Sequence, residues 1–186
     1  MVFVDAQNLY HRCRHHFGHP WVHPQALAEA LVAEDRVKQG DTHVLHGVRY
    51  YTGIHDANRN SRGHALMKRR LCAYEAAGVH TLRIPLRYDS SGRAREKGVD
   101  VRMALDLFRM GSKGLYDVAI IVSEDSDLDP AAQDVYSLRD AERWIAVENA
   151  LPWGGPNSHT RWLASVRRRR RIDRELFDRI RDTNRY

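Results

Sequence analysis

Residues 118–130 read VAIIVSEDSDLDP, an apolar run of strand-forming residues that passes directly into an acidic stretch. A run of this length and composition predicts a buried strand. Other short runs of strand-forming residues lie at 2–4, 42–51, 79–84 and 143–147. Segments with apolar residues at helical spacing separate these runs. Strands that alternate with helices imply parallel pairing through right-handed crossovers. We therefore predict an α/β fold, a three-layer α/β/α sandwich with a mainly parallel sheet of about five strands.

The length of 186 residues is that of one domain, and 42% hydrophobic with 29% charged residues is an ordinary globular composition. No apolar run approaches the ~18 residues of a membrane-spanning helix, and no signal-peptide pattern is present. Two single cysteines, Cys13 and Cys72, fit neither a disulfide framework nor a zinc site with paired cysteines. We therefore expect free thiols, a cytoplasmic location and no membrane partner.

The positive charge is concentrated at one end of the chain. The net charge is +6, and residues 151–186 alone contain 10 Arg against 4 acidic residues, so residues 1–150 are neutral overall. A strong local basic field favours a polyanion such as nucleic acid, because phosphate neutralisation releases counterions. We expect a main domain over 1–150 and an Arg-rich extension over 151–186 that includes a basic amphipathic helix. A solvated basic helix without such a partner is the alternative.

Polar side chains gather where parallel strands place functional groups, just beyond the carboxyl ends of the strands. They are Asp5 and Asn8 after the first strand, Ser123, Asp125 and Asp127 after the fourth, and Asp100 and Asp106 on the helix before the fourth. Crowded carboxylates repel one another unless a cation lies among them. Oxygen ligands without Cys or His favour Mg²⁺ or Mn²⁺, which can hold a phosphodiester. Each acid could instead cap a helix or, in the case of Asp106, pair with Arg102.

Three segments resemble the motifs of a known family in order and spacing. VFVDAQNLY at 2–10, KGVDVRMALDL at 97–107 and VAIIVSEDSDLDP at 118–130 are similar to the three motifs of the NYN domain family, which belongs to the PIN-like nucleases. The resemblance spans roughly residues 1–150. It implies a parallel sheet flanked by helices and a metal-dependent ribonuclease activity.

The resemblance also implies roles for the acidic residues. Asp5, Asp100 and Asp125 match positions that would be direct or water-mediated metal ligands. Asp127 matches the second acid of the third motif, and Asp106 matches the second acid of the helical motif. We therefore expect the first four to be catalytic and to hold the metal, with Asp106 as a further metal ligand.

Uncharged residues match two other motif positions, and three positions depart from the family pattern. Asn8 matches an asparagine that orders the site and that we count as catalytic, and Ser123 matches the serine at the head of the third motif, in a supporting role. Family members usually have Gly where Glu124 stands and Phe where Leu128 stands, and Asp129 is an additional acid. These departures leave the choice of substrate open.

Basic side chains would carry the RNA. Those that we expect to contact it are Arg59, Arg62, Lys68, Arg69, Lys97, Arg167, Arg168 and Arg169. Tyr50, Tyr51 and Trp153 are available for stacking on unpaired bases. Surface arginines are common and strand tyrosines often lie in the core, so a purely structural role is the alternative for each.

The sequence predicts a metal-dependent endoribonuclease that acts on RNA, with single-stranded or tRNA-like RNA as the expected substrate. Attack by water would leave 5′-phosphate and 3′-hydroxyl ends. A haloacid-dehalogenase-type phosphatase would need a second Asp where Gln7 stands, and a dinucleotide-binding Rossmann domain would need glycines after Val4. The main alternative is a non-catalytic RNA-binding or protein-interaction module on the same fold. A homo-oligomer or a regulatory protein partner stays open.

Overall fold

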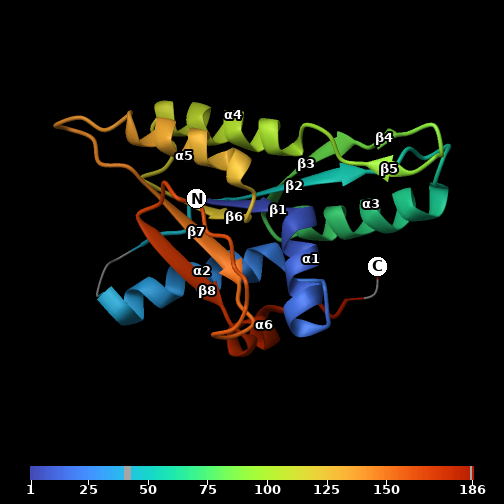
Figure 1. Cartoon of the computed structure of the whole chain (residues 1–186), viewed down its shortest axis with the longest axis horizontal. Helices are drawn as coiled ribbons and strands as arrows, with labels where there is room; N and C mark the ends of the chain where they lie inside the picture. The colour runs from blue at the N-terminus through green and yellow to red at the C-terminus, as the bar shows by residue number, and fades with distance from the viewer. Residues whose placement is uncertain (40–42, 185) are drawn as a thin grey trace.

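The computed structural model describes residues 1–39, 43–184 and 186, and Figure 1 shows its elements. Within these ranges the main sheet is made of β1 (Val2–Asp5), β2 (Val48–Ile54), β3 (Val79–Pro85), β6 (Val118–Val122), β7 (Ala146–Pro152) and β8 (Arg168–Ile172). The helices are α1 (Ala6–Phe17), α2 (Pro24–Gln39), α3 (Ser61–Ala76), α4 (Val99–Ser112), α5 (Asp129–Tyr136) and α6 (Arg174–Ile180). A small antiparallel pair consists of β4 (Arg87–Tyr88) and β5 (Ala94–Arg95), and η1 (Ser126–Leu128) is a turn of 3₁₀-helix. No helix in the described part of the chain has the length and apolar character needed to cross a membrane.

The sheet has the order β3-β2-β1-β6-β7-β8, and its neighbouring strands are parallel. The chain builds outward from β1 through β2 to β3 and then crosses back to β6 on the other side of β1. Val4 of β1 lies opposite Val122 of β6. These two strands form the switch point of the sheet, and ligands bind beyond the carboxyl ends of the strands at such points.

Side chains of the sheet alternate between two faces, and helices cover both. Val2 and Val4 belong to the buried cluster that includes residues of α1, α2, α3 and α6, whereas Phe3 between them packs in the cluster with α4 and α5. Figure 1 shows α4 and α5 on one side of the sheet and α1, α2 and α3 on the other. The predicted three-layer α/β/α sandwich is confirmed.

The arginine run forms a strand that the sequence pattern did not predict. Residues of this run make up β8, which pairs in parallel with β7 at the edge of the sheet. Arg170 and Ile172 are buried, whereas Arg171 between them and Arg169 before them are exposed. Only every second side chain of a strand at the edge of a sheet needs to be buried. A run of arginines can therefore form a strand if each buried guanidinium is paired with an acidic group. The sheet therefore has six described strands instead of about five, and the basic helix is limited to α6, which Asp173 caps by accepting a hydrogen bond from the Leu176 backbone.

The buried arginine of β8 is paired with a glutamate of β7. Arg170 Nε donates to Glu148 Oε2 at 2.6 Å, and Arg170 Nη1 donates to the Leu31 carbonyl oxygen at 2.9 Å. The two charged side chains are only 1% and 5% exposed. Because an unpaired charge at this depth is strongly destabilising, the pair fixes β8 against both β7 and α2.

Two strands have bounds that differ from the predicted ones. β2 begins at Val48, whereas a strand was predicted from residue 42, which lies outside the described residues. β7 begins at Ala146 and continues to Pro152, and all of its residues are buried. Burial on both faces explains why β7 carries no polar alternation by which its end could be recognised. The sheet therefore continues from the main domain into the Arg-rich extension without a break.

Asp182 joins the end of the chain to α3. Its carboxylate accepts hydrogen bonds from the hydroxyl groups of Tyr74 (2.9 Å) and Tyr186 (2.8 Å) and from the Asn184 backbone (3.1 Å). Burial acts to raise the pKa of Asp182, but the hydrogen bonds outweigh this effect and hold its pKa below the 3.8 of a free aspartate. A carboxyl whose pKa is lower in the folded state stabilises the fold fully above its unfolded pKa, and this contribution is lost as the pH falls through the folded pKa.

We expect Asp182→Asn to lower the free energy of unfolding by about 1–3 kcal/mol at neutral pH, because Asn is a weaker acceptor for the buried Tyr74 hydroxyl and the partly buried Tyr186 hydroxyl. The variant should also lose less stability than the parent as the pH falls below about 4. Urea unfolding across this pH range measures both effects. Asp178→Asn, which changes an exposed carboxyl on α6, serves as the control. Equal acid sensitivity of the Asp182 variant and the parent would contradict the prediction.

Candidate metal centre

Hydrogen bonds join the ends of β1 and β6. Asp5 is the last residue of β1 and caps α1, where its Oδ1 accepts a hydrogen bond from the Asn8 backbone at 3.0 Å. Its Oδ2 accepts one from Ser123 Oγ at 3.1 Å. Asn8 Oδ1 accepts a third from the Glu124 backbone at 3.1 Å. Asp5, Asn8 and Ser123 therefore form one connected unit at the switch point.

The carboxyl of Asp5 lies in a strongly perturbed environment. Burial raises its pKa, hydrogen bonds from the Asn8 backbone and Ser123 lower it, and the nearby Asp125 raises it again, so the pKa is higher than that of a free aspartate. The dominant cause is the loss of solvent around the carboxyl. A cation placed near Asp5 would favour its charged form.

The acidic stretch after β6 folds into a short turn that places two carboxylates at the site. The Asp125 backbone donates a hydrogen bond to Ser123 Oγ at 3.2 Å, and Asp125 Oδ1 accepts one from the Asp127 backbone at 3.0 Å. Leu128 at the end of η1 is 1% exposed and anchors the turn in the core. Hydrogen bonds at its start and the buried Leu128 at its end therefore fix the conformation of the turn.

Asp100 reaches the same place from a different layer of the molecule. It lies in the first turn of α4, two residues after Gly98, whose φ of 84° is a left-handed conformation that glycine adopts readily. Asp100, Asp125 and Asp127 each bring a carboxylate oxygen to a group whose members lie within 4.8 Å of one another. Asp100 and Asp125 are partly buried and Asp127 is exposed, which leaves one side of the group open.

The chemistry of this donor set fits a divalent cation. Among the described His, Cys, Asp and Glu side chains, these three carboxylates are the group of three or more with such spacing. Asp5 lies beside the group, linked to it through Ser123, but is not a member of it. Oxygen ligands with room for further oxygens are what Mg²⁺ and Mn²⁺ prefer in sites that act on phosphates.

A family model for the NYN domain matches residues 1–145, which is most of the chain. The chain belongs to the NYN domain family. NYN proteins are generally nucleases with a PIN-like fold, and they usually use divalent metal ions. No curated protein matches the chain.

A solved structure has a similar fold. The crystal structure of a protein of unknown function from Vibrio parahaemolyticus RIMD 2210633 is 18% identical in sequence to this chain, with a TM-score of 0.61. The similarity covers 94% of this chain and 92% of that one. This share is larger than the part matched by the NYN model, so the similar fold includes some of the Arg-rich extension.

Asp106, the second acid of the NYN helical motif, lies away from the three-carboxylate group. Its Oδ2 accepts hydrogen bonds from Arg49 Nη2 at 3.1 Å, the Tyr51 hydroxyl at 3.2 Å and Arg102 Nε at 3.2 Å. Its side chain is 6% exposed. The carboxylate is therefore already neutralised by two guanidinium groups, one of which is the Arg102 named as its alternative partner.

Glu96 is an acid beside the NYN site that the sequence reasoning missed. It lies between β5 and α4, and its Oε1 accepts a hydrogen bond from the Gly53 backbone at 2.5 Å. Burial raises the pKa of Glu96, the hydrogen bond from Gly53 partly offsets this, and the nearby Asp5 and Asp100 raise it further. A Cβ at Gly53 would collide with Glu96 and Leu86, so glycine permits the close approach. Glu96 precedes the KGVD motif in a loop, where no periodic pattern signals its role.

The residues that depart from the NYN pattern have structural partners. Glu124 forms an ion pair with Arg12 of α1, with Oε2 and Nε 3.3 Å apart. Asp129 Oδ1 accepts hydrogen bonds from the backbones of Ala164 (2.8 Å) and Ser165 (3.1 Å) in the segment before β8. The two additional acids therefore bind other parts of the chain instead of enlarging the carboxylate group.

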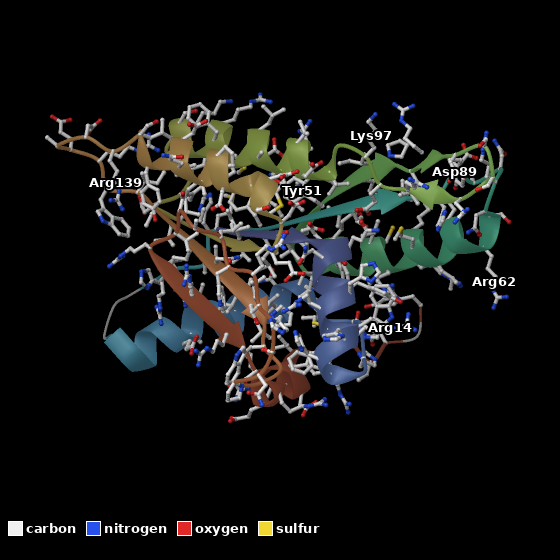
Figure 2. All side chains as sticks on the ribbon, in the orientation of Figure 1. Arg14, Tyr51, Arg62, Asp89, Lys97 and Arg139 are labelled. Atoms are coloured by element: carbon white, nitrogen blue, oxygen red, sulfur yellow. The ribbon has the colours of Figure 1, made fainter. Side chains whose placement is uncertain are left out.

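The basic residues expected to contact RNA are spread over several elements. Arg59, Arg62, Lys68 and Arg69 are exposed on α3 or just before it, and Lys97 is exposed just before α4. Figure 2 shows Lys97 near the start of α4 and Arg62 at the outer end of α3, in the opposite layer. Helices that follow parallel strands begin at the carboxyl edge of the sheet, so Arg59, Arg62 and Lys97 lie on the same edge as the carboxylates.

Arg167, Arg168 and Arg169 are not brought to the carboxylate group. β8 is the third strand from β1 along the sheet, and these residues lie at its start or before it, toward the amino edge. Tyr51 is 0% exposed and lies beneath α4, where Figure 2 labels it, so it cannot stack on a base. Trp153 is partly exposed and carries the Arg171 guanidinium 4.5 Å above its ring.

Proposed function

We propose that the chain is a metal-dependent endoribonuclease that hydrolyses phosphodiester bonds of RNA through an Asp-rich site. The observation that carries the proposal is the convergence of Asp100, Asp125 and Asp127, from two separate segments, at the switch point of a parallel sheet. Three carboxylates in such a position repel one another, and they are retained at low cost only if a cation balances them. Membership of a family whose members are generally nucleases agrees with this chemistry.

We propose that Asp100, Asp125 and Asp127 hold Mg²⁺ or Mn²⁺, with Asp5 as a water-mediated partner. Such an ion supplies charge neutralisation at the phosphate and activation of water. Hydrogen bonds from Ser123 and from the Asn8 backbone hold the Asp5 carboxylate in a fixed position beside the three other carboxylates. Asn8 joins α1 to the turn after β6, which keeps the carboxylates at a fixed spacing. Hydrolysis by water in this arrangement gives 5′-phosphate and 3′-hydroxyl ends.

The substrate class in this proposal is RNA with an unpaired segment, either single-stranded or tRNA-like. Arg59, Arg62 and Lys97 are exposed on the same edge of the sheet as the carboxylates and would neutralise phosphates of an RNA that crosses this edge. The arginines of β8 lie too far along the sheet to do this for the same nucleotide. The exposed arginines of this strand, Arg169 and Arg171, would contact a longer RNA that continues across the molecule.

The test is incubation of the purified protein with end-labelled single-stranded RNA in Mg²⁺, in Mn²⁺ or in EDTA. An Asp5→Asn and Asp125→Asn double variant is examined beside it. We expect cleavage that requires metal, that leaves 5′-phosphate ends and that is absent from the double variant. RNA binding that is equal in EDTA, with no shortening of several RNAs, would favour a non-catalytic RNA-binding module.

Metal binding should also be visible without activity. At a free Mn²⁺ concentration of about 100 times Kd, a ligand that binds only the folded state adds about 2.7 kcal/mol to the free energy of unfolding. For a chain of this size we expect this to raise Tm by roughly 5–10 °C. Thermal melting of the Asp100→Asn variant is the matched control and should show a much smaller rise. Equal rises in both proteins would place the ion elsewhere.

A further inference from the structure

A hollow of about 380 Å³ has one end near Asp5 and Asp100. It is bounded by α1, β2 and α3 and by residues around β5, and Gln7 and Glu96 form its end nearest the site. Gln7 is two residues from Asp5 along the chain. Glu96 lies close enough to Asp5 and Asp100 for their negative charges to raise its pKa. The volume is in the ~300–1000 Å³ range of small-molecule sites. One end of the hollow therefore lies near the place where a phosphodiester would be cut.

Flat side chains form one wall of the hollow. The rings of Tyr10 and Trp21 meet edge to face, with their centroids 4.7 Å apart. The guanidinium of Arg70 lies over the Trp21 ring, 3.3 Å from its centroid. Tyr10, Trp21 and Arg70 are all partly exposed, unlike the fully buried Tyr51. Aromatic rings and a stacked guanidinium at a water-accessible surface are the groups on which unpaired bases stack.

Polar groups around this wall can recognise the edge of a flat ligand. Within the described residues, the buried Arg70 Nε has no hydrogen-bond acceptor, and an unused buried donor is destabilising until it is satisfied. His11, His55 and Glu96 also line the hollow and offer donors or acceptors. A nucleobase combines a flat apolar face with a polar edge. A sugar lacks the stacking face, and a phosphate would be repelled by Glu96 and the neighbouring aspartates.

We propose that this hollow binds one unpaired nucleobase of the RNA, next to the phosphodiester held at Asp100, Asp125 and Asp127. The inference rests on the proposed ribonuclease function and names the feature of the substrate that the site reads. A base can enter the hollow only if it has left its stack and its pairing partner, so the pocket selects single-stranded segments and excludes intact duplexes. Tyr10 and Trp21 supply the stacking surface, and Arg70 holds the ring of Trp21 in place.

The experiment uses single-stranded RNAs that carry one 2-aminopurine, placed at each position in turn. They are titrated into an Asp125→Asn background, so that the RNA stays intact during the measurement. Stacking on aromatic rings quenches 2-aminopurine fluorescence, and we expect strong quenching at one position only. Tyr10→Ala should abolish that quenching and weaken binding roughly 5- to 150-fold, whereas Tyr10→Phe should preserve both. The same RNA in a duplex should show no quenching.

Trp144→Leu is the matched control, because Trp144 is 48% exposed and lies just before β7, at the opposite edge of the sheet. This variant should bind and quench as the parent does, and thermal melting of every variant checks that it is folded. Unchanged quenching in both Tyr10→Ala and Trp21→Leu would overturn the pocket, as would uniform quenching along the RNA. Cleavage by the parent protein is assayed separately. Position-specific quenching without cleavage would support the base-binding hollow and contradict the nuclease proposal. Cleavage without position-specific quenching would support the nuclease proposal and contradict the base-binding hollow.

Discussion

Asp125→Asn is expected to reduce RNA cleavage by at least ~100-fold while leaving the fold intact. The cost should exceed the ~10–100-fold that loss of an indirect partner of a metal site brings, because our proposal makes Asp125 a direct ligand. Asn can still accept the hydrogen bond from the Asp127 backbone that shapes η1. Removing one of three neighbouring negative charges also relieves repulsion, so Tm without metal should be unchanged or higher. Initial cleavage rates in Mn²⁺ and melting curves in EDTA measure the two effects.

Asp106→Asn provides the contrast, because the same change is made at an acidic residue of another motif of the same family. This carboxylate balances Arg49 and Arg102 and accepts a hydrogen bond from Tyr51. We expect a loss of roughly 2–3 kcal/mol in the free energy of unfolding, less than the ~3–5 kcal/mol of a fully buried pair because both arginines reach solvent. Residual cleavage at a temperature where the variant is folded should remain far above that of Asp125→Asn. An Asp106→Asn variant that is as stable as the parent but does not cleave RNA would show that this residue belongs to the metal site.

Arg170→Met is expected to be the most destabilising single change outside the apolar core. It leaves Glu148, itself 5% exposed, as a buried charge without its guanidinium. Breaking a pair at this depth typically lowers the free energy of unfolding by ~3–5 kcal/mol, a large part of the total stability of a domain. The Leu31 carbonyl also loses the donor that ties α2 to β8. Urea unfolding followed by circular dichroism measures the loss.

Two further variants separate burial from charge in the same strand. Arg169→Met changes the neighbouring, exposed arginine and should stay within about 0.5 kcal/mol of the parent protein. The double change Arg170→Met and Glu148→Met should recover most of the stability, because a buried ion pair can be replaced by apolar side chains at little cost. If Arg169→Met and Arg170→Met were equally destabilising, the alternation of faces along β8 would be incorrect.

Two kinds of information predicted parts of the fold and site. The local sequence pattern identified the strands and helices, and parallel pairing indicated which of their ends lie together. Apolar runs such as 118–122 identify strands by composition alone, and parallel pairing then brings the ends of β1 and β6 together. Asp5 and Ser123 therefore lie in hydrogen-bond contact, 118 residues apart in the chain. Asp100 could be placed because it stands at the start of a helix that the apolar spacing predicts, within the KGVD motif.

The parts that could not be predicted depend on which side chains meet through the fold. From the sequence, Arg170 cannot be distinguished from the exposed arginines beside it, because its partner Glu148 lies on a neighbouring strand. Glu96 stands in a loop without periodicity, and its place beside Asp5 and Asp100 follows only from the path of the chain past Gly53. Asp106 has a motif position in the sequence, but two arginines determine its environment.

β8 is the last strand of the sheet, so one of its edges has no further strand against it among the described residues. An open edge is a template on which a strand from another molecule can add, which is how many sheet proteins aggregate. A second copy that approached through its own β8 would bring arginines against arginines along most of the contact. The arginine run thus disfavours the addition of another β8 strand to this edge of the sheet.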